Sequence, residues 1–475
     1  MSRTFRRHLA IAAAITFALV ACGNSGDDDS TATTAASGGA VTTAGPDDTS
    51  GDTTDTTASG SGDDQRDTFV HLDGVPGVTD DAINYDIIGT ISNNPLGTCI
   101  VECYQAGIEA YFAFRNDEGG IYGRQLKVNQ VMDDELGANQ QRALDFISAN
   151  DAFGDFNATL LATGWADLQN AGVPTYVWAI HGAEANGNDH IFGSIPSLCE
   201  GCVGRGVPYL AQQAGAHHAA SLGYGDSENS KLCAQAAGRS FETYQDVTGV
   251  DSAYVNDSIP FGMPNGIAPQ VSEMKAAGVD FITTCFDING MVTLAQELER
   301  QGMGDVTLLH PNSYNQEVVA QNADLWEGDF VNVSFRPFEA DPSGTQLEDF
   351  LTWMDNTGQE PSELAMVGWI NADEAFTGLL AAGPEFDRDS VVAATNQLTD
   401  YNAGGILIPI DWTRQHIQPT EGDTSHDYPQ ECILTLKIHD GAFETLAPSD
   451  TPWLCWPNDN TDLTDPTPTN FAAGD

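Results

Sequence analysis

The stretch Asp117-Glu-Gly-Gly-Ile-Tyr-Gly-Arg-Gln-Leu126 joins two segments of different periodicity. Before it, residues 102–116 carry apolar side chains at helical spacing, which predicts an amphipathic helix. From its end, residues 125–132 alternate between apolar and polar side chains, which predicts a β-strand. A helix that returns through a glycine-rich turn into a strand is typical of α/β folds.

The alternation of strands and helices continues on both sides of this turn. We predict strands at residues 85–91, 125–132, 153–161, 175–180, 217–222, 252–256, 281–286 and 306–309. We predict helices at residues 102–116, 139–148, 165–171, 207–213, 230–248, 267–277 and 291–301. This order predicts parallel sheets covered by helices on both faces. Because a body of roughly 400 residues exceeds what one hydrophobic core usually serves, we expect an α/β protein with two lobes.

The N-terminus carries the pattern of an export signal. Arg3, Arg6 and Arg7 precede an apolar run at residues 9–20, which is too short for a membrane span of about 20 residues. The run ends at Ala21-Cys22, so residues 1–22 resemble a bacterial lipoprotein signal whose Cys22 becomes the lipidated first residue. A soluble signal peptide with a chance cysteine is the alternative. Residues 23–68 are mostly Ser, Thr, Gly and Asp, which predicts a disordered linker before a body that begins near Phe69.

The composition is strongly acidic. The chain has 17 basic and 69 acidic residues, a net charge of -52. This charge disfavours nucleic acid and anionic lipid surfaces as partners. It keeps an exported protein soluble and would suit a saline habitat, where salt screens the self-repulsion.

The cysteines predict disulfides. Nine cysteines less Cys22 leave eight, an even number in an exported chain. Eight cysteines allow 105 pairings, so the sequence alone cannot choose among them. Proximity along the chain favours Cys99 with Cys103, Cys199 with Cys202, Cys233 with Cys285 and Cys432 with Cys455. The Cys199-Glu-Gly-Cys202 loop could instead be a redox motif or half of a zinc site.

Several short motifs together resemble one family. The turn at residues 117–126 and the pair Asp133-Asp134 are similar to the "GGI-x-GR" turn and "DD" of type I periplasmic binding proteins, the branched-chain amino-acid-binding group of ABC-transporter receptors. The other matching motifs, in the family's order, are Ala171-Gly-Val-Pro174, Tyr224-Gly-Asp226, Ala277-Gly-Val-Asp280 and Gly404-Gly-Ile406.

This resemblance implies two hinged Rossmann-like lobes with parallel central sheets, joined by three crossings. Lobe 1 would take residues 69–204 and 337–410, lobe 2 would take residues 205–336 and 411–460, and residues 461–475 would be a flexible tail. The implied function is that of an extracytoplasmic solute-binding lipoprotein of an ABC importer. Its expected partners are a small polar ligand, such as a branched-chain amino acid or an amide, and the permease subunits. The membrane would be reached through the lipid anchor only, and the protein would be a monomer without cofactor or metal.

Two other functions stay open at this point. A ligand-sensing surface lipoprotein without a transport role could use the same fold. A secreted enzyme is the less favoured alternative, because the sequence lacks the G-x-S-x-G, H-E-x-x-H and P-loop motifs.

The resemblance also points to ligand contacts in the loops after the strands, where open α/β sheets bind their ligands. Asn312 stands where the family has an acidic residue, and an amide cannot pair with the ammonium of an amino acid. Either Asp287 replaces that acid or the ligand is not a simple α-amino acid. Thr163 and Asn312 could instead be caps or turn residues, Phe286 a core residue and His181 a surface residue. The expected contacts are Asn93, Thr163, Ala179, His181, Asn229, Phe286, Asp287 and Asn312.

Overall fold

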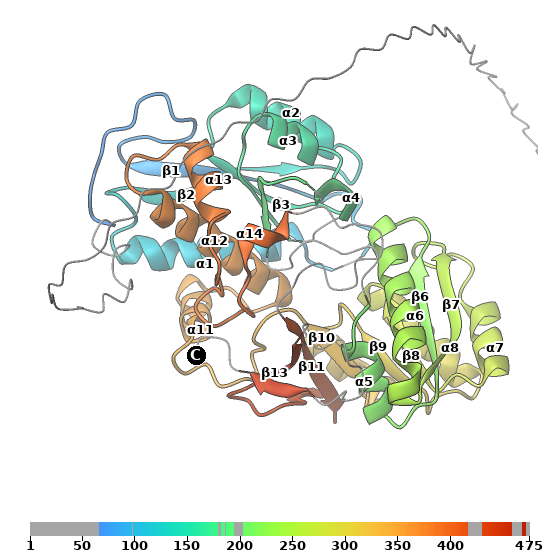
Figure 1. The fold of residues 1–475 in the computed structure, drawn as a ribbon. Helices are drawn as coiled ribbons and strands as arrows, with labels where there is room; N and C mark the ends of the chain where they lie inside the picture. Colours follow the sequence, from blue (N-terminus) through green and yellow to red (C-terminus); the bar gives the residue numbers. More distant parts are fainter. Residues whose placement is uncertain are drawn as a thin grey trace, which may run out of the picture. The chain divides into compact units, whose positions relative to one another are not determined.

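A computed structural model describes residues 66–96, 98–178, 182–185, 187–193, 203–416, 430–457 and 468–471. These residues form two β-sheets with helices around them (Figure 1). Cys22, residues 23–65 of the predicted linker, Ala179, His181, Cys199 and Cys202 lie outside the described residues. Arg66, which was predicted to be in that linker, donates from Nε to the carbonyl oxygen of Gly120 at 2.9 Å, so the ordered body begins before Phe69. Within the described part, no helix is long and apolar enough to cross a membrane.

The first sheet has the strand order β2-β1-β3-β4-β5, and all its neighbouring strands are parallel. β1 and β3 are buried along nearly their whole length, as expected for strands covered on both faces. The bounds of the strands are β1 Ala82–Gly89, β2 Gln125–Asp133, β3 Gly154–Ala158, β4 Thr175–Val177 and β5 Ile191–Gly193.

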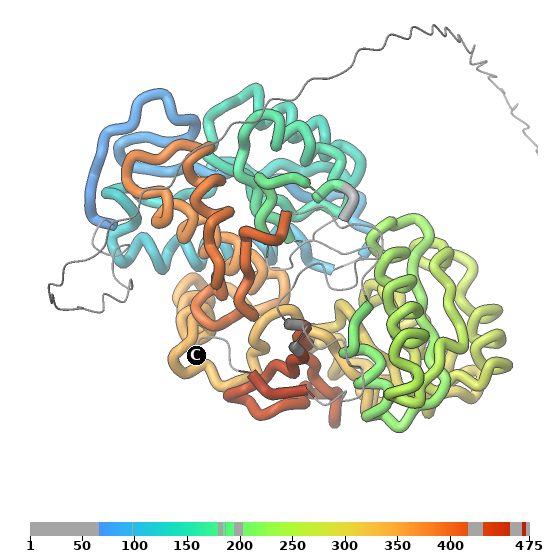
Figure 2. Tube along the Cα trace, viewed as in Figure 1, coloured from blue at the N-terminus to red at the C-terminus, as the bar shows by residue number. Residues whose placement is uncertain are grey.

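Helices from two separate parts of the chain cover this sheet. α1 (Val101–Asp117) and α12 (Glu363–Ala382) pack with Tyr85 of β1 on one face, and α2 (Asn139–Ala149) packs on the other. The return of the chain to lobe 1 after residue 337 is visible in Figure 2, where the orange α12 runs beside the cyan α1. The remaining helices of this lobe are α3 Trp165–Asn170, α4 Gly182–Ala185, α11 Gln346–Thr357, α13 Arg388–Thr395 and α14 Trp412–Gln415.

Glycines allow α1 and α12 to approach closely. A Cβ atom added at Gly107 would lie 1.7 Å from the carbonyl oxygen of Ala365, and one at Gly368 would lie 2.0 Å from that of Tyr104. Any side chain at either position would therefore force the two helices apart.

Helix α14 packs on lobe 1. The Trp412 ring meets the Phe192 ring edge-on at 5.2 Å, and His416 Nε2 lies 2.7 Å from the carbonyl oxygen of Ile191. Residues 411–416 therefore associate with the first sheet, whereas the family resemblance implied that residues 411–460 belong to the second lobe. The difference arises because Trp412 completes the core beside β5.

The second sheet is mixed. Its order is β14-β13-β11-β10-β9-β8-β6-β7, with β12 paired to β11. β6 to β10 are parallel, but β11, β12, β13 and β14 pair in antiparallel fashion. β14 falls within the predicted flexible tail, so part of that tail is a strand. The strands are β6 His218–Tyr224, β7 Asp251–Ile259, β8 Phe281–Cys285, β9 Thr307–His310, β10 Phe330–Val333, β11 Gln430–His439, β12 Ala442–Thr445, β13 Trp453–Pro457 and β14 Thr469–Phe471.

The helices of the second lobe alternate with its parallel strands, as predicted. The long α6 begins with a side-chain cap, because Ser227 accepts a hydrogen bond from the N–H of Ser230, and ends at Gly249 in the left-handed conformation. The helices are α5 Gly206–Gln213, α6 Glu228–Thr248, α7 Ala268–Ala277, α8 Ile288–Arg300, α9 Gln316–Gln321 and α10 Ala323–Trp326.

The described residues contain three of the four expected disulfides, and the cysteines of the fourth, Cys199 and Cys202, lie outside them. The three disulfides join Cys99 to Cys103, Cys233 to Cys285 and Cys432 to Cys455. The Cys432–Cys455 bridge connects β11 to β13, so it fixes the antiparallel edge that was added to the parallel strands.

Two segments that pass between the sheets are anchored by buried arginines. Arg336 follows β10, and its Nε donates a hydrogen bond of 3.2 Å to the carbonyl oxygen of Gly405. Arg205 precedes α5, and its Nε lies 3.3 Å from the carboxylate of Glu431 at the start of β11. The crossings are therefore held to neighbouring segments by specific polar contacts.

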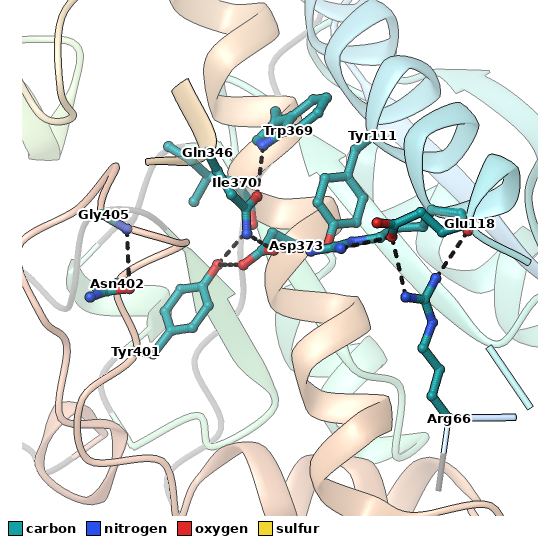
Figure 3. A network of polar contacts seen from close by, with 11 residues as sticks. Arg66, Tyr111, Glu118, Gln346, Trp369, Ile370, Asp373, Tyr401, Asn402 and Gly405 are labelled. Atoms are coloured by element: carbon teal, nitrogen blue, oxygen red, sulfur yellow. Dashed lines mark hydrogen bonds and ion pairs between the residues drawn. The ribbon is translucent and has the colours of Figure 1, made fainter. Parts of the chain in front are cut away.

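A polar network lies inside lobe 1 (Figure 3). Asp373 of α12 accepts hydrogen bonds from the Tyr111 hydroxyl at 2.7 Å, from Gln346 Nε2 at 2.9 Å and from the Tyr401 hydroxyl at 3.2 Å. Arg115 lies 3.6 Å from the same carboxylate. These contacts tie α1, α11 and the loop at residue 401 to the centre of α12.

Candidate functional site

The carboxyl ends of the parallel strands bring Asn93 and Thr163, the predicted lobe 1 contacts among the described residues, to one edge of the first sheet. Thr90, directly after β1, accepts a hydrogen bond of 3.2 Å from the N–H of Leu160, which follows β3. The N–H of Asp134, directly after β2, donates to the carbonyl oxygen of Gly89 at 2.9 Å. The three loops therefore form one continuous edge, where such sheets bind ligands.

Asp133 organises the loop that contains Asn93. Its carboxylate accepts hydrogen bonds from the N–H groups of Ile91 at 3.1 Å, Ser92 at 3.0 Å and Glu135 at 2.9 Å. Burial alone would raise the pKa of Asp133, but the hydrogen bonds from Ser92 and the backbone lower it below its ordinary value. Asn93 itself has a positive φ of 60° and donates to the carbonyl oxygen of Glu135 at 3.2 Å. Its side chain therefore helps to hold two loops together.

Apolar side chains are exposed at the same edge. Ile91 follows β1 and is 36% exposed, and Leu161 follows β3 and is 44% exposed. Trp178 directly follows β4 and is half-buried, and the predicted contact Thr163 is exposed. The edge therefore offers apolar surface together with a hydroxyl group.

In lobe 2, Asp287 caps helix α8. Its Oδ1 accepts hydrogen bonds from the N–H groups of Asn289 at 2.9 Å and Gly290 at 3.1 Å. Its Oδ2 accepts a hydrogen bond of 2.7 Å from the Tyr224 hydroxyl at the end of β6. Burial raises the pKa of Tyr224, and the hydrogen bond to Asp287 raises it further, so this hydroxyl stays protonated and donates.

Phe286 is completely buried, with no exposed surface. Its ring stacks on the Tyr224 ring at a centroid distance of 4.6 Å. The structure therefore supports the alternative that Phe286 is a core residue, and it corrects the expectation that Phe286 contacts the ligand. The physical reason is that the ring packs on Tyr224 at the end of β6, the strand that pairs with β8 in the sheet.

The other expected contacts of lobe 2 lie close to Asp287. Asn312, after β9, is exposed and donates from Nδ2 to the carbonyl oxygen of Phe286 at 3.2 Å. Asn229 is half-buried in the first turn of α6, and the adjacent Ser230 donates to the carbonyl oxygen of Cys285 at 2.7 Å. Asn229, Asp287 and Asn312 therefore share the carboxyl edge of the second sheet.

Sequence reasoning missed two residues at these edges. Asn289 donates from Nδ2 to the carbonyl oxygen of Leu96, which is a direct contact between the loops of the two lobes. Tyr224 was recognised only as part of a turn, although it binds Asp287. An aspartate directly before an amphipathic helix is an N-cap signal, so the sequence could have predicted that Asp287 caps α8.

A cavity of about 560 Å³ lies elsewhere in lobe 1. It is lined by Asp189 and His190, which precede β5, and by Trp412 and His416 of the α14 region. It is therefore at the amino end of β5, not at the carboxyl ends where the predicted contacts gather.

The comparison with known families agrees with this architecture. The sequence matches the family described as periplasmic binding protein over residues 100–424. The chain belongs to the periplasmic binding protein family. The type I fold predicted from the motifs is thereby confirmed, as is the expectation that the protein is not an enzyme, since the family is one of binding proteins. Membership in this family implies a location outside the cytoplasm.

Solved structures share the fold of this periplasmic binding protein at low sequence identity. A leucine-binding protein from Thermotoga maritima has a TM-score of 0.62 at 13% identity, covering 80% of this chain and 100% of its own. A fatty acid ABC transporter substrate-binding protein from Thermomonospora curvata has a TM-score of 0.59 at 17% identity, covering 78% and 92%. A solute-binding protein from R. palustris in complex with 4-hydroxybenzoate has a TM-score of 0.58 at 16% identity, covering 76% and 95%. No curated protein matches the sequence.

Proposed function

We propose that this periplasmic binding protein captures a small solute between its two lobes and delivers it to the permease of an ABC importer. The observation that carries the proposal is that predicted contacts from both sheets gather at the carboxyl ends of the strands, in a chain whose family consists of binding proteins. The similar structures from Thermotoga, Thermomonospora and R. palustris have leucine, fatty acid and 4-hydroxybenzoate in their names, so this fold serves small solutes of several chemical classes.

The proposed contacts are groups that present free polar or apolar surface at these edges. Thr163 and Asn312 are exposed, and Asn229 is half-buried. Ala179 and His181 remain proposals by resemblance. In place of Phe286, we propose Phe261 as the aromatic ligand contact of lobe 2. Phe261 follows β7 and is half-buried, and its ring packs on the Tyr224 ring at a centroid distance of 4.7 Å.

A ligand screen tests the binding function. Thermal unfolding in the presence of amino acids, amides and small acids should show an increase in Tm for one class, because a ligand at 100 times its Kd stabilises the folded state by about 2.7 kcal/mol. Uptake of that solute should fall in cells that lack the protein. Unchanged uptake would contradict the transport role and favour a sensory role.

The lipid anchor is a second part of the proposal. The signal pattern at residues 1–22 and the polar linker at residues 23–68 support a protein held at the outer face of the cell membrane by a lipid on Cys22. Cys22→Ser should release the protein into the medium or leave its signal uncleaved, while Ser25→Ala, in the adjacent linker, should leave the protein in the membrane fraction. Fractionation and mass spectrometry of the N-terminal peptide measure both results. Membrane retention of a Cys22→Ser protein whose signal has been cleaved would contradict the anchor.

A further inference from the structure

We propose that Asp155 of β3 is a neutral carboxylic acid whose hydroxyl donates a hydrogen bond to the side-chain amide of Asn157, and that the pairing of β1 with β3 weakens when this proton is lost. The two side chains lie on the same face of β3, because residues i and i+2 of a strand point to the same side of a sheet. Asp155 is 0% exposed and Asn157 is 1% exposed, so water cannot supply hydrogen bonds to either side chain.

The hydrogen bonds of this pair are incomplete without an added proton. Asn157 Nδ2 donates to Asp155 Oδ2 at 2.8 Å, which fixes the orientation of the amide. Asp155 Oδ1 and Asn157 Oδ1 are both buried and have no donor among the described residues. An ionised carboxylate and an amide oxygen are both acceptors, so neither can satisfy the other. A proton on Asp155 Oδ1 supplies the missing donor and would close an acid–amide pair with two hydrogen bonds.

A second buried acid lies beside the pair. Asp86 of β1 is the register partner of Asp155, so the two carboxyl groups are on the same face of adjacent parallel strands. Asp86 is buried and accepts a hydrogen bond of 3.0 Å from Asn129 Nδ2. Burial raises the pKa of Asp86 to about 6 although this hydrogen bond opposes the shift, so Asp86 is ionised at neutral pH. A second carboxylate at Asp155 would repel it, which favours a proton on Asp155.

The helices that cover this face supply no positive charge to Asp155. Helix α2 packs here with the apolar side chains of Ala143 and Phe146. The guanidinium of Arg388 donates to the carbonyl oxygens of Phe153 at 2.8 Å and Ala152 at 2.7 Å, which commits it to the backbone before β3. Burial therefore raises the pKa of Asp155 well above its ordinary value of 3.8. The hydrogen bond from Asn157 opposes this rise in part, and the charge of Asp86 adds to it.

Two other titratable groups are close to these acids, and neither is basic. Asp151, before β3, is exposed, and its charge adds to the rise in the pKa of Asp86. Tyr104 of α1 is buried, and burial together with the charges of Asp155 and Glu374 raises its pKa well above the ordinary value, so its hydroxyl stays neutral. The surroundings of Asp155 therefore favour its neutral form from every side.

The proton makes the stability of lobe 1 depend on pH. The unfolded chain releases it near the ordinary pKa of 3.8, whereas the folded chain keeps it. The stability that the pair contributes is therefore complete below about pH 4 and is lost as the pH rises toward the folded-state pKa. Because β1 and β3 end at the loops that Thr90 and Leu160 join, the same proton supports the edge of the sheet at the candidate site.

Asp155→Asn tests the inference, because an amide at this position keeps both hydrogen bonds of the pair but cannot lose a proton. Urea unfolding at pH 4, 6 and 8 would compare the variant with the wild type. We expect the advantage of the variant, as a ratio of folding equilibrium constants, to be smallest at pH 4 and to grow by up to about tenfold for each pH unit above it. An advantage that does not change with pH overturns the inference. Failure of the variant to fold also overturns it, because two paired amides would replace the acid and the amide without loss of a hydrogen bond.

Asp151→Asn is the matched control, since it makes the same substitution at an exposed position four residues earlier. Its effect on the folding equilibrium constant should vary by no more than about twofold over the same pH range. A pH dependence of equal size in both variants would assign the effect to the general repulsion between acidic residues and overturn the inference.

Carbon NMR of protein labelled at the aspartate carboxyl carbons observes the proton directly. The signal that is missing from the spectrum of Asp155→Asn belongs to Asp155. We expect this signal to have the chemical shift of a protonated carboxyl group at pH 7. The shift of a carboxylate at pH 7 overturns the inference.

Discussion

One buried side chain of lobe 1, that of Glu374, has a protonation state that the sequence does not reveal. Glu374 lies next to Asp373 on α12 and has no exposed surface. Within the described residues, neither carboxyl oxygen has a hydrogen bond of good geometry. Burial raises the pKa of Glu374 well above its ordinary value of 4.5, Asp373 raises it further, and the Trp412 indole opposes this only in part. The folded protein therefore keeps a proton on Glu374 that the unfolded chain releases.

Glu374→Gln should stabilise the protein at neutral pH. Because the pKa is raised in the folded state, the wild-type side chain is tolerated fully below pH 4.5 and loses stability as the pH rises. The advantage of the glutamine should be near zero at pH 4 and should grow by up to about 1.4 kcal/mol per pH unit above 4.5. Urea unfolding at pH 4, 5.5 and 7 measures it. A difference in free energy of unfolding that does not change with pH would show that Glu374 is ionised in the folded state.

Between elements, the packing of α1 on α12 depends on two glycines. Gly107→Ala should destabilise the protein by about 2 kcal/mol or more, because the new Cβ would lie 1.7 Å from a carbonyl oxygen of α12 and the backbone must move. Gly137→Ala is the matched control, since a Cβ there has no atom within 4 Å and should change stability by less than about 0.5 kcal/mol. Thermal unfolding of both variants gives the comparison. Similar values of Tm would mean that the two helices are not in this close contact.

The three described disulfides allow a test of how the stabilisation by a disulfide depends on the length of the loop that it closes. The loops that they close differ in length, with sequence separations of 52 for Cys233–Cys285, 23 for Cys432–Cys455 and 4 for Cys99–Cys103. Replacing each pair by alanines should lower the free energy of unfolding by about 4, 3 and 2 kcal/mol in that order, because a longer loop gains more entropy when it opens. Denaturant titrations measure the series. The reverse order would indicate that contacts in the folded state dominate over chain entropy.

The elements themselves were largely predictable, because their periodicity is local. The predicted strand at residues 281–286 corresponds to β8 (Phe281–Cys285), and the predicted helix at residues 230–248 corresponds to α6 (Glu228–Thr248). The antiparallel edge of the second sheet could not be derived this way, because β10 and β11 pair Phe330 with Lys437 across a long separation in the chain.

The sequence predicted where the candidate site lies. It did not predict which of the side chains there are already hydrogen-bonded or buried. The resemblance placed Asp287 and Asn312 together, and the structure has both at the edge of the second sheet. The Asp287 carboxylate accepts a hydrogen bond from the hydroxyl of Tyr224, a residue 63 positions away in the sequence. The burial of Phe286 likewise depends on its stacking on Tyr224 and not on its own position after a strand. Local patterns find an edge of a sheet, but partners distant in sequence decide which groups remain free there.

For the whole molecule, the excess of acidic residues is the dominant long-range force. A net charge of -52 spread over one chain produces self-repulsion that the compact state feels more than the unfolded chain does. Several of the described arginines form local ion pairs, such as Arg142 with Glu135 and Arg300 with Glu297. These pairs offset only part of the repulsion, so the remainder should respond to ionic strength.

Added salt should therefore raise the stability of this protein. The Debye length falls from about 10 Å at 0.1 M to about 3 Å at 1 M, so most of the repulsion between separated surface carboxylates is screened within this range. We expect Tm to rise steeply in NaCl up to about 0.5 M and then to level off. A rise that continues linearly beyond 1 M would instead reflect exclusion of salt from the apolar surface, which strengthens burial without saturating. Repeating the titration near pH 4, where many carboxylates are protonated, is the control: the steep initial rise should shrink there because the charges that salt screens are fewer. A rise of the same size at both pH values would show that charge repulsion is not what salt relieves.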